Sequence, residues 1–170
     1  MGATITKQRR VRAVLAAAVL TLAVTAAACG PAEAPPPPGC PSAPPDAMTS
    51  SLLNLTNASR AAHGQPALDW NARLACLAGE WSSVMAGGRG LAHRDLNAAI
   101  RSPGFESYGS LAENIFVGPG GISPDAVHTA WWNSEGHRNN IIGDVDAIGI
   151  GWAKSPNGQI WITVNFGRHM

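Results

Sequence analysis

The side chains best suited to chemistry are concentrated in residues 111–140 of a chain that is only 14% charged. Glu113 supplies a carboxylate, Ser134 a hydroxyl, His137 an imidazole and Arg138 a guanidinium. Ser134 and His137 are three residues apart, a spacing compatible with contact on a helix, so a nucleophile and a base oriented by Glu113 would support hydrolysis. No nucleophile-elbow motif surrounds Ser134 and no oxyanion-hole donors can be identified, so hydrolysis is one hypothesis and not the favoured one.

A helix is expected to present this cluster. Residues 123–125 (Ser-Pro-Asp) have the types typical of an N-cap, a first helical position and a first-turn acid. Apolar side chains then recur at helical spacing over residues 127–134, which assigns Trp131 to the core. Trp132 falls off this apolar face and could line a groove. Gly136 is expected to interrupt the helix just before the His-Arg pair.

The remaining pattern predicts helices first and a β-hairpin last. Two helices are expected near residues 52–62 and 71–86, and residues 97–109 look irregular. Residues 148–166 alternate with a period of two around a Ser-Pro-Asn-Gly turn, which indicates a hairpin with one apolar face. Helices, short strands and a closing hairpin are typical of an α+β domain in which helices cover a sheet.

Residues 1–28 are interpreted as an export signal. A basic run at residues 7–12 precedes an alanine-rich apolar stretch that ends in three alanines and Cys29. Small residues that lead into a cysteine resemble a bacterial lipobox, in which the cysteine becomes the lipid-modified first residue. Ordinary cleavage after an Ala-x-Ala and a retained membrane anchor are the alternatives. The chain is therefore predicted to be exported, either onto the outer face of the cell membrane or into the extracellular space.

Residues 29–46 are rich in proline and carry almost no large apolar side chain, so they are expected to form an extended tether ahead of a folded domain at 47–170. Cys40 lies in this tether, and Cys76 lies opposite the apolar face of the second helix. Because an exposed thiol outside the cell invites oxidation, a Cys40–Cys76 disulfide is expected, with two free thiols as the alternative.

The net charge of the chain argues against nucleic acid as a partner. From Cys29 onward the chain has eight basic and eleven acidic residues, a net charge of −3, because four of the twelve basic residues precede it. This leaves no electrostatic case for nucleic-acid binding. The 170 residues suffice for one domain with a proper core, which we expect to be monomeric.

A series of segments between Thr49 and Gly167 resembles one known family. They are 57–60 (Asn-Ala-Ser-Arg), 66–70 (Pro-Ala-Leu-Asp-Trp), 91–93 (Leu-Ala-His), 112–115 (Ala-Glu-Asn-Ile), 131–141, 148–151 and 164–167. In this order they look like the CAP superfamily of cysteine-rich secretory proteins, antigen 5 and plant pathogenesis-related proteins, in its compact bacterial branch. The resemblance implies a three-layer α-β-α sandwich of the CAP type and an extracellular setting.

The resemblance also implies a cavity. His93 and Glu113 match one histidine and one acid of the two-His, two-acid set of eukaryotic members, while the second histidine and second acid are absent. The bacterial Ser-x-Gly-His-Arg motif at 134–138 could bring His137 to the cavity from another direction. His93, Glu113 and His137 would then offer three ligands and leave one position open, which predicts weak, reversible binding of a divalent metal such as zinc. Folding is expected to require no cofactor.

Each candidate also has a purely structural interpretation. The two imidazoles could simply form hydrogen bonds with backbone groups, and Glu113 could pair with Arg138. Asn114 is expected to act as a backbone brace more than as a ligand, and Asn139 and Asn140 are expected to be helix-surface or capping groups.

Three classes of function stay open. The favoured one is a membrane-tethered extracellular domain that binds a lipid, peptide or glycan without catalysis. Its groove would be lined by His93, Glu113 and His137, with Asn114, Trp132, Ser134 and Arg138 around them. The second class is a hydrolase that uses Ser134, His137 and Glu113. The third is a structural protein of the cell envelope, in which the polar cluster only stabilises the fold.

Overall fold

The computed structural model describes residues 33–170, so the expected export signal and Cys29 lie outside the described part. The elements are, in chain order, α1 (Ala47–Ala62), β1 (Asp69–Trp70), α2 (Ala72–Val84), a π-helical turn (Met85–Arg89), α3 (Leu96–Ile100), β2 (Tyr108–Pro119), α4 (Pro124–Asn133), α5 (Glu135–Ile142), β3 (Ala147–Lys154) and β4 (Gln159–His169). The strands form one sheet in the order β1-β3-β4-β2. β4 is antiparallel to both of its neighbours, and β1 is parallel to β3.

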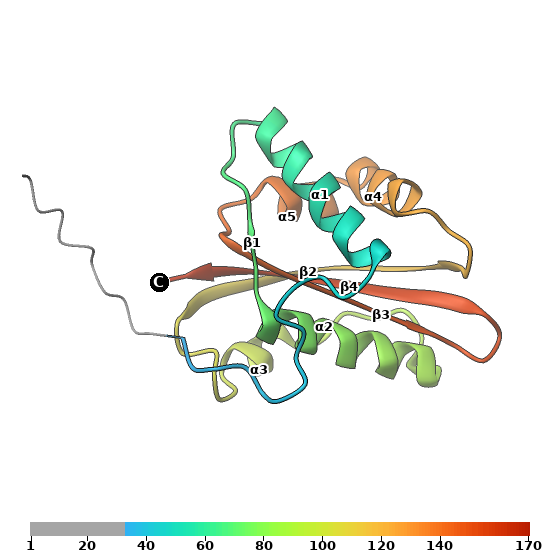
Figure 1. The fold of residues 1–170 in the computed structure, drawn as a ribbon, viewed down its shortest axis with the longest axis horizontal. Helices are drawn as coiled ribbons and strands as arrows, with labels where there is room; N and C mark the ends of the chain where they lie inside the picture. Colours follow the sequence, from blue (N-terminus) through green and yellow to red (C-terminus); the bar gives the residue numbers. More distant parts are fainter. Residues whose placement is uncertain (1–32) are drawn as a thin grey trace, which may run out of the picture.

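Helices cover both faces of this sheet. α1, α4 and α5 lie on one face, and α2 and α3 lie on the other (Figure 1). The predicted three-layer α-β-α sandwich is therefore confirmed. The largest core cluster joins one face of β3 and β4 to the first group of helices, through side chains that include Leu52, Trp131, Ile141, Ile162 and Phe166.

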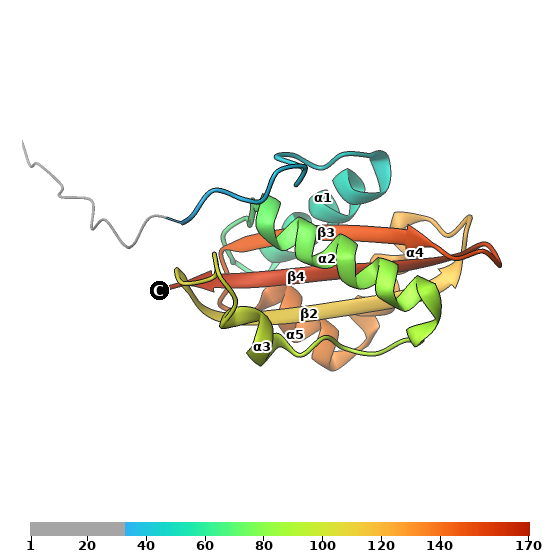
Figure 2. The ribbon, with the colours of Figure 1, turned by 90° about the horizontal axis from the view of Figure 1, so that it is seen from below.

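The predicted apolar face of the hairpin is confirmed, and the opposite face is buried as well. On the second face of β4, Trp161, Thr163 and Asn165 are also buried, because α2 packs across it (Figure 2). Glycines on β3 allow this close approach, since a Cβ at Gly149 or Gly151 would overlap backbone atoms of α2. A strand that is buried on both faces needs, on each face, side chains small enough or shaped to fit the helices packed there.

Two local predictions on the helices were wrong, and one was right. Ser123 caps α4 and Pro124 follows it, as expected. The helix break falls at Ser134, whose extended backbone (ψ 121°) ends α4 and begins α5, while Gly136 lies inside α5. The region expected to be irregular contains the short helix α3, which Asp95 initiates by accepting the N–H of Ala98 at 2.9 Å.

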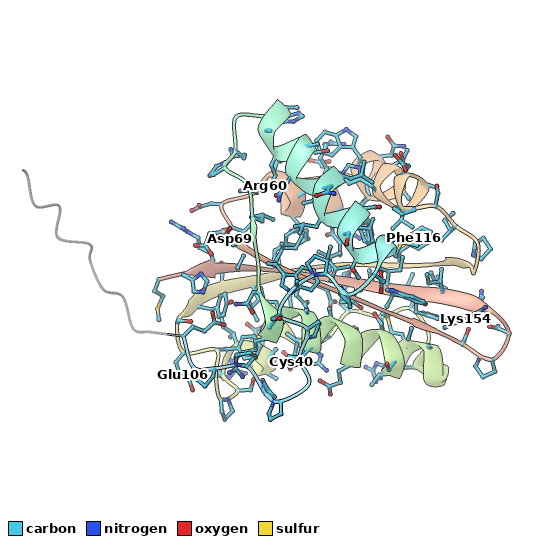
Figure 3. All side chains as sticks on the ribbon, viewed as in Figure 1. Cys40, Arg60, Asp69, Glu106, Phe116 and Lys154 are labelled. Carbon is cyan, nitrogen blue, oxygen red and sulfur yellow. A yellow bond between two sulfur atoms is a disulfide. The ribbon has the colours of Figure 1, made fainter. Side chains whose placement is uncertain are left out.

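Arg60 is a cation placed inside the fold. Its side chain is 1% exposed and lies between α1 and α5 (Figure 3). The guanidinium donates to four backbone carbonyls at 2.8–2.9 Å, those of Pro66, Ile141, Gly143 and Val145. Burial lowers the pKa of Arg60, and the charges of the nearby aspartates at 144 and 146 oppose this shift. The fork of five donors fits this cage of acceptors and ties four chain segments together.

Residues 33–46, which we call the strap, lie against the domain and do not extend away as a free tether (Figure 2). The predicted disulfide joins Cys40 to Cys76 on α2, with Cα atoms 5.3 Å apart (Figure 3). Trp70 donates to the carbonyl of Pro41 at 2.8 Å, and Glu33 accepts from Asn71 at 2.9 Å. The physical reason is that proline removes backbone donors but leaves its carbonyls free to accept from the domain.

Within residues 33–170, no helix combines the length and the apolar composition that crossing a membrane requires.

We predict that Arg60→Lys lowers the free energy of unfolding by about 3 kcal/mol. The ammonium has three donors and no planar fork, so buried carbonyls are left without partners at about 1–3 kcal/mol each. Urea unfolding measures the change. Arg101→Lys, at an exposed position, is the control and should change stability by less than about 0.5 kcal/mol. Equal losses in the two variants would contradict a special role for the Arg60 cage.

Candidate functional site

The candidate site straddles β2, which is an edge strand of the sheet. Successive side chains of a strand point to opposite faces, so Glu113 and Asn114 reach opposite layers. Glu113 contacts the loop that precedes α3, and Asn114 contacts α5. The strand thereby brings together two segments from opposite sides of the sheet.

Glu113 is a buried carboxylate. The residue is 4% exposed, and its Oε1 accepts from Nδ1 of His93 at 2.8 Å and from the backbone N–H of Arg94 at 3.1 Å. Its Oε2 is buried and has no hydrogen-bond partner among the described residues. Burial raises the pKa of Glu113, and the hydrogen bonds from His93 and Arg94 oppose this rise. A half-satisfied buried carboxylate is costly, which makes it a candidate for function.

His93 is the exposed partner of this pair, because 57% of its side chain is accessible. An ionised carboxylate can only accept, so the proton of neutral His93 is assigned to Nδ1, which faces Glu113. Nε2 then carries the lone pair. The imidazole thus offers an oriented acceptor on the surface, held from behind by Glu113.

Two asparagines attach α5 to β2. Asn114 donates to the carbonyl of His137 at 3.0 Å, which confirms its predicted role as a backbone brace. Asn140 donates to the carbonyl of Glu113 at 3.1 Å and to the side-chain oxygen of Asn114 at 2.9 Å. The expectation that Asn140 is a surface or capping group was therefore wrong. Its position three residues after His137, on the same side of the helix, is the signal that could have found it.

His137 lies near His93 but does not complete a triad. Burial lowers the pKa of His137, and the charge of a protonated His93 lowers it further. Ser134 begins α5, and the described residues show no hydrogen bond between its side chain and His137. Glu113 orients His93 and not His137. The arrangement that hydrolysis would need is not assembled.

The other two predicted lining residues turn elsewhere. Arg138 donates to the carbonyl of Trp132 at 2.8 Å, so the expected ion pair with Glu113 is not formed. The ring of Trp132 lies 5.0 Å from that of His63 and 6.0 Å from that of His128. Trp132 therefore contacts α1 and its own helix, and its predicted place in a groove with Glu113 has no support.

The metal prediction lacks an assembled ligand set. Across residues 33–170, no group of three or more His, Cys, Asp or Glu side chains is placed to hold a metal ion. Glu113 accepts from Nδ1 of His93, so in this arrangement the carboxylate holds the imidazole and leaves Nε2 free. Zinc binding by His93, Glu113 and His137 stays a prediction.

Five cavities on the described part of the chain are lined by other residues, and the His93 side chain is exposed at the surface.

We predict that Glu113→Gln changes how stability depends on pH. Because the folded pKa of Glu113 is raised, the unfolded chain loses this proton first, and wild-type stability falls as pH rises from about 4.5 through the folded pKa. The glutamine variant lacks this loss. It should therefore gain stability relative to wild type over that window, by about 1.4 kcal/mol per unit of pKa difference. Urea unfolding at pH 4, 5.5 and 7 measures it, and parallel pH curves would contradict the raised pKa.

The sequence of this chain matches known proteins. The cysteine-rich secretory protein family, CAP, matches residues 53–166. The chain is 32% identical over 128 residues to the uncharacterized protein YkwD of Bacillus subtilis (strain 168), across 72% of this chain and 48% of that protein. It thus spans about half the length of this curated relative.

Solved structures agree on the fold. An outer surface protein from Borrelia burgdorferi is similar with a TM-score of 0.62 and 21% identity, over 72% of this chain and 93% of that one. An extracellular protein containing a SCP domain from Bacillus anthracis str. Ames is similar with a TM-score of 0.55 and 27% identity, over 70% of this chain and 39% of that one. The family match covers about two thirds of the sequence, and the chain belongs to the cysteine-rich secretory protein (CAP) family.

Proposed function

We propose that this chain is an extracellular, membrane-tethered binding domain that contacts a small ligand through His93 without catalysing a reaction. The observation that carries the proposal is the pairing of an exposed imidazole with a buried carboxylate, at 2.8 Å. Because more than half of the His93 side chain is accessible, a ligand can reach the imidazole that Glu113 orients. The unassembled Ser134–His137–Glu113 triad supports binding over hydrolysis.

The chemistry of the pair suits a ligand that donates hydrogen bonds. In its neutral form His93 presents Nε2 as an acceptor, and Glu113 fixes the orientation of the ring. Hydroxyl groups of a glycan or a lipid head group, or N–H groups of a peptide, can donate to it. Nearby His137, whose pKa is lowered by burial, adds a second neutral imidazole from α5.

The export part of the proposal rests on residues 1–29 and on the family. The basic run, the alanine-rich stretch and Cys29 resemble a lipoprotein signal. The B. anthracis relative is described as extracellular, and the B. burgdorferi relative as an outer surface protein.

We predict that Cys29→Ser moves the protein from the membrane fraction to the soluble extracellular fraction. The serine variant cannot carry the thioether-linked lipid, and the acyl chains supply the membrane affinity. Cell fractionation with immunoblotting measures this, and Cys40→Ser serves as the control that leaves the anchor intact. Membrane retention of Cys29→Ser would favour a retained spanning segment.

We predict that one class among three probes stabilises the domain through His93. The probes are an N-acetylglucosamine trisaccharide, trialanine and short-chain phosphatidylglycerol, each added to the purified protein. A probe at a hundredfold excess over its Kd adds about 2.7 kcal/mol of stability, which raises Tm by several degrees. His93→Ala should abolish the increase.

His63→Ala is the matched control, because His63 is an exposed histidine at the end of α1. It should keep the increase in Tm. His128 is unsuitable, since it is buried against Ser59. If no probe shifts Tm, a structural role in the envelope becomes the better explanation. An unchanged shift in His93→Ala would place the ligand elsewhere.

A further inference from the structure

The outer edge of β3 is free beyond its short pairing with β1. Among the described residues, β1 is the strand on this side of β3, and it pairs only with Ala147 and Ile148. Asn71 donates its backbone N–H to the carbonyl of Ile148 at 2.8 Å, so Ile148 faces β1. Alternate residues of an antiparallel strand direct both of their backbone groups to the same side. The N–H and C=O groups of Ile150 and Trp152 therefore point outward, away from β4.

These outward backbone groups lack partners in the part of the chain that the structure describes. Among residues 33–170, no hydrogen bond reaches the backbone N–H or C=O of Ile150 or Trp152 from this side. Ile150 is nevertheless only 1% exposed. Buried backbone groups in proteins are nearly always paired, so this edge of the sheet is incomplete.

The strap runs beside this edge without pairing with it (Figure 2). Pro41, Pro44 and Pro45 have no backbone N–H, so this stretch cannot supply the donors of an added strand. A groove of about 450 Å³ remains between the strap, β3 and α2. This volume is within the usual range for small-ligand sites. Neither His93 nor Glu113 lines the groove, so it is separate from the pair on β2.

One acidic side chain at the groove has no counter-charge. Asp46 lines the groove beside α1, and its carboxylate accepts from the indole of Trp152 and from the backbone N–H of Thr49, both at 2.9 Å. None of the ion pairs among residues 33–170 includes Asp46. Glu80, the other acid at the groove, pairs with Arg94. No described residue that lines the groove is basic, so the groove is complementary to a cationic group near Asp46.

We propose that this groove binds an extended peptide, which adds a strand to the edge of β3 and places a lysine or arginine side chain at Asp46. The backbone of an extended peptide offers the donors and acceptors that Ile150 and Trp152 lack. Neighbouring side chains of a strand point to opposite layers, so the residues that flank the basic one face α2. There α2 lies so close that a Cβ at Gly151 would overlap the backbone of Gly79. Small flanking side chains such as alanine therefore fit this side.

NMR titration of the full isotope-labelled chain tests the proposal with acetyl-Ala-Lys-Ala-amide as the probe. The N–H signals of Ile150 and Trp152 should shift to saturation, because both groups gain hydrogen bonds. The same peptide with every backbone nitrogen methylated keeps its side chains but cannot donate. It should bind at least about tenfold more weakly, because strand pairing needs those donors. No saturable shift at Ile150 and Trp152, or equal affinity of the two peptides, would overturn the proposal.

A pair of variants at one position tests the edge itself. Trp152→Pro removes an outward N–H and no hydrogen bond to β4, which makes proline tolerable there. Trp152→Ala removes the indole to the same extent but keeps the N–H. The proline variant should bind the lysine peptide at least about fivefold more weakly than the alanine variant, the loss expected for one hydrogen bond. Equal affinities in two folded variants would contradict strand addition.

Asp46→Asn tests where the cationic side chain lies. Asparagine caps a helix about as well as aspartate, so α1 is kept while the charge is lost. The wild-type chain should prefer the lysine peptide to its uncharged norleucine analogue by about three- to fivefold, as expected for a partly exposed ion pair. Asp46→Asn should lose this preference. Asp95→Asn, at the cap of α3 and outside the groove, should keep it. No preference in the wild-type chain, or one that survives in Asp46→Asn, would refute the assigned position.

Discussion

The fold depends on one buried guanidinium. Arg60 binds carbonyls from the loop before β1, from the end of α5 and from the loop that enters β3. A cation in the interior is tolerated only because all of its surroundings are oriented acceptors. Arg60 thereby determines where α5 ends, and hence where the His137–Arg138 segment lies against the sheet.

The candidate site depends on the position of β2 at the edge of the sheet. An interior strand would have had helices over both Glu113 and Asn114, with no path to solvent. At the edge, the loop carrying His93 and the helix carrying His137 both reach β2, and one imidazole stays exposed. Asn114 and its partner Asn140 fasten α5 to the backbone of β2. On the other face of β2, the buried Glu113 holds the exposed His93 through a hydrogen bond of 2.8 Å.

Much of this could be predicted from sequence because it depends on local chemistry. The cap at Ser123, the alternation in β3 and β4 and the contact of Trp131 with the core all follow from spacing and residue type. The Cys40–Cys76 pairing followed from the exposed side of a helix and an oxidising compartment. Resemblance to the family supplied the layer order, which no local pattern contains. What was missed depends on contacts between distant residues, such as the carbonyls more than eighty residues away that Arg60 binds. The inward role of Asn140 likewise needs the position of β2, and local rules cannot choose among partners that only the tertiary fold brings close.

The strand order has a consequence for how the chain is made. β4 follows every other element in sequence, yet it lies inside the sheet and pairs with both β2 and β3. While the ribosome is still adding residues 159–169, β2 has no partner strand and the helices have no complete surface to cover. The nascent chain must therefore remain without its sheet until residues 159–169 have been made, and the sheet forms as a unit afterwards. Such a delay leaves the earlier helices and strands without their partners for longer than in a sheet built from strands consecutive in sequence.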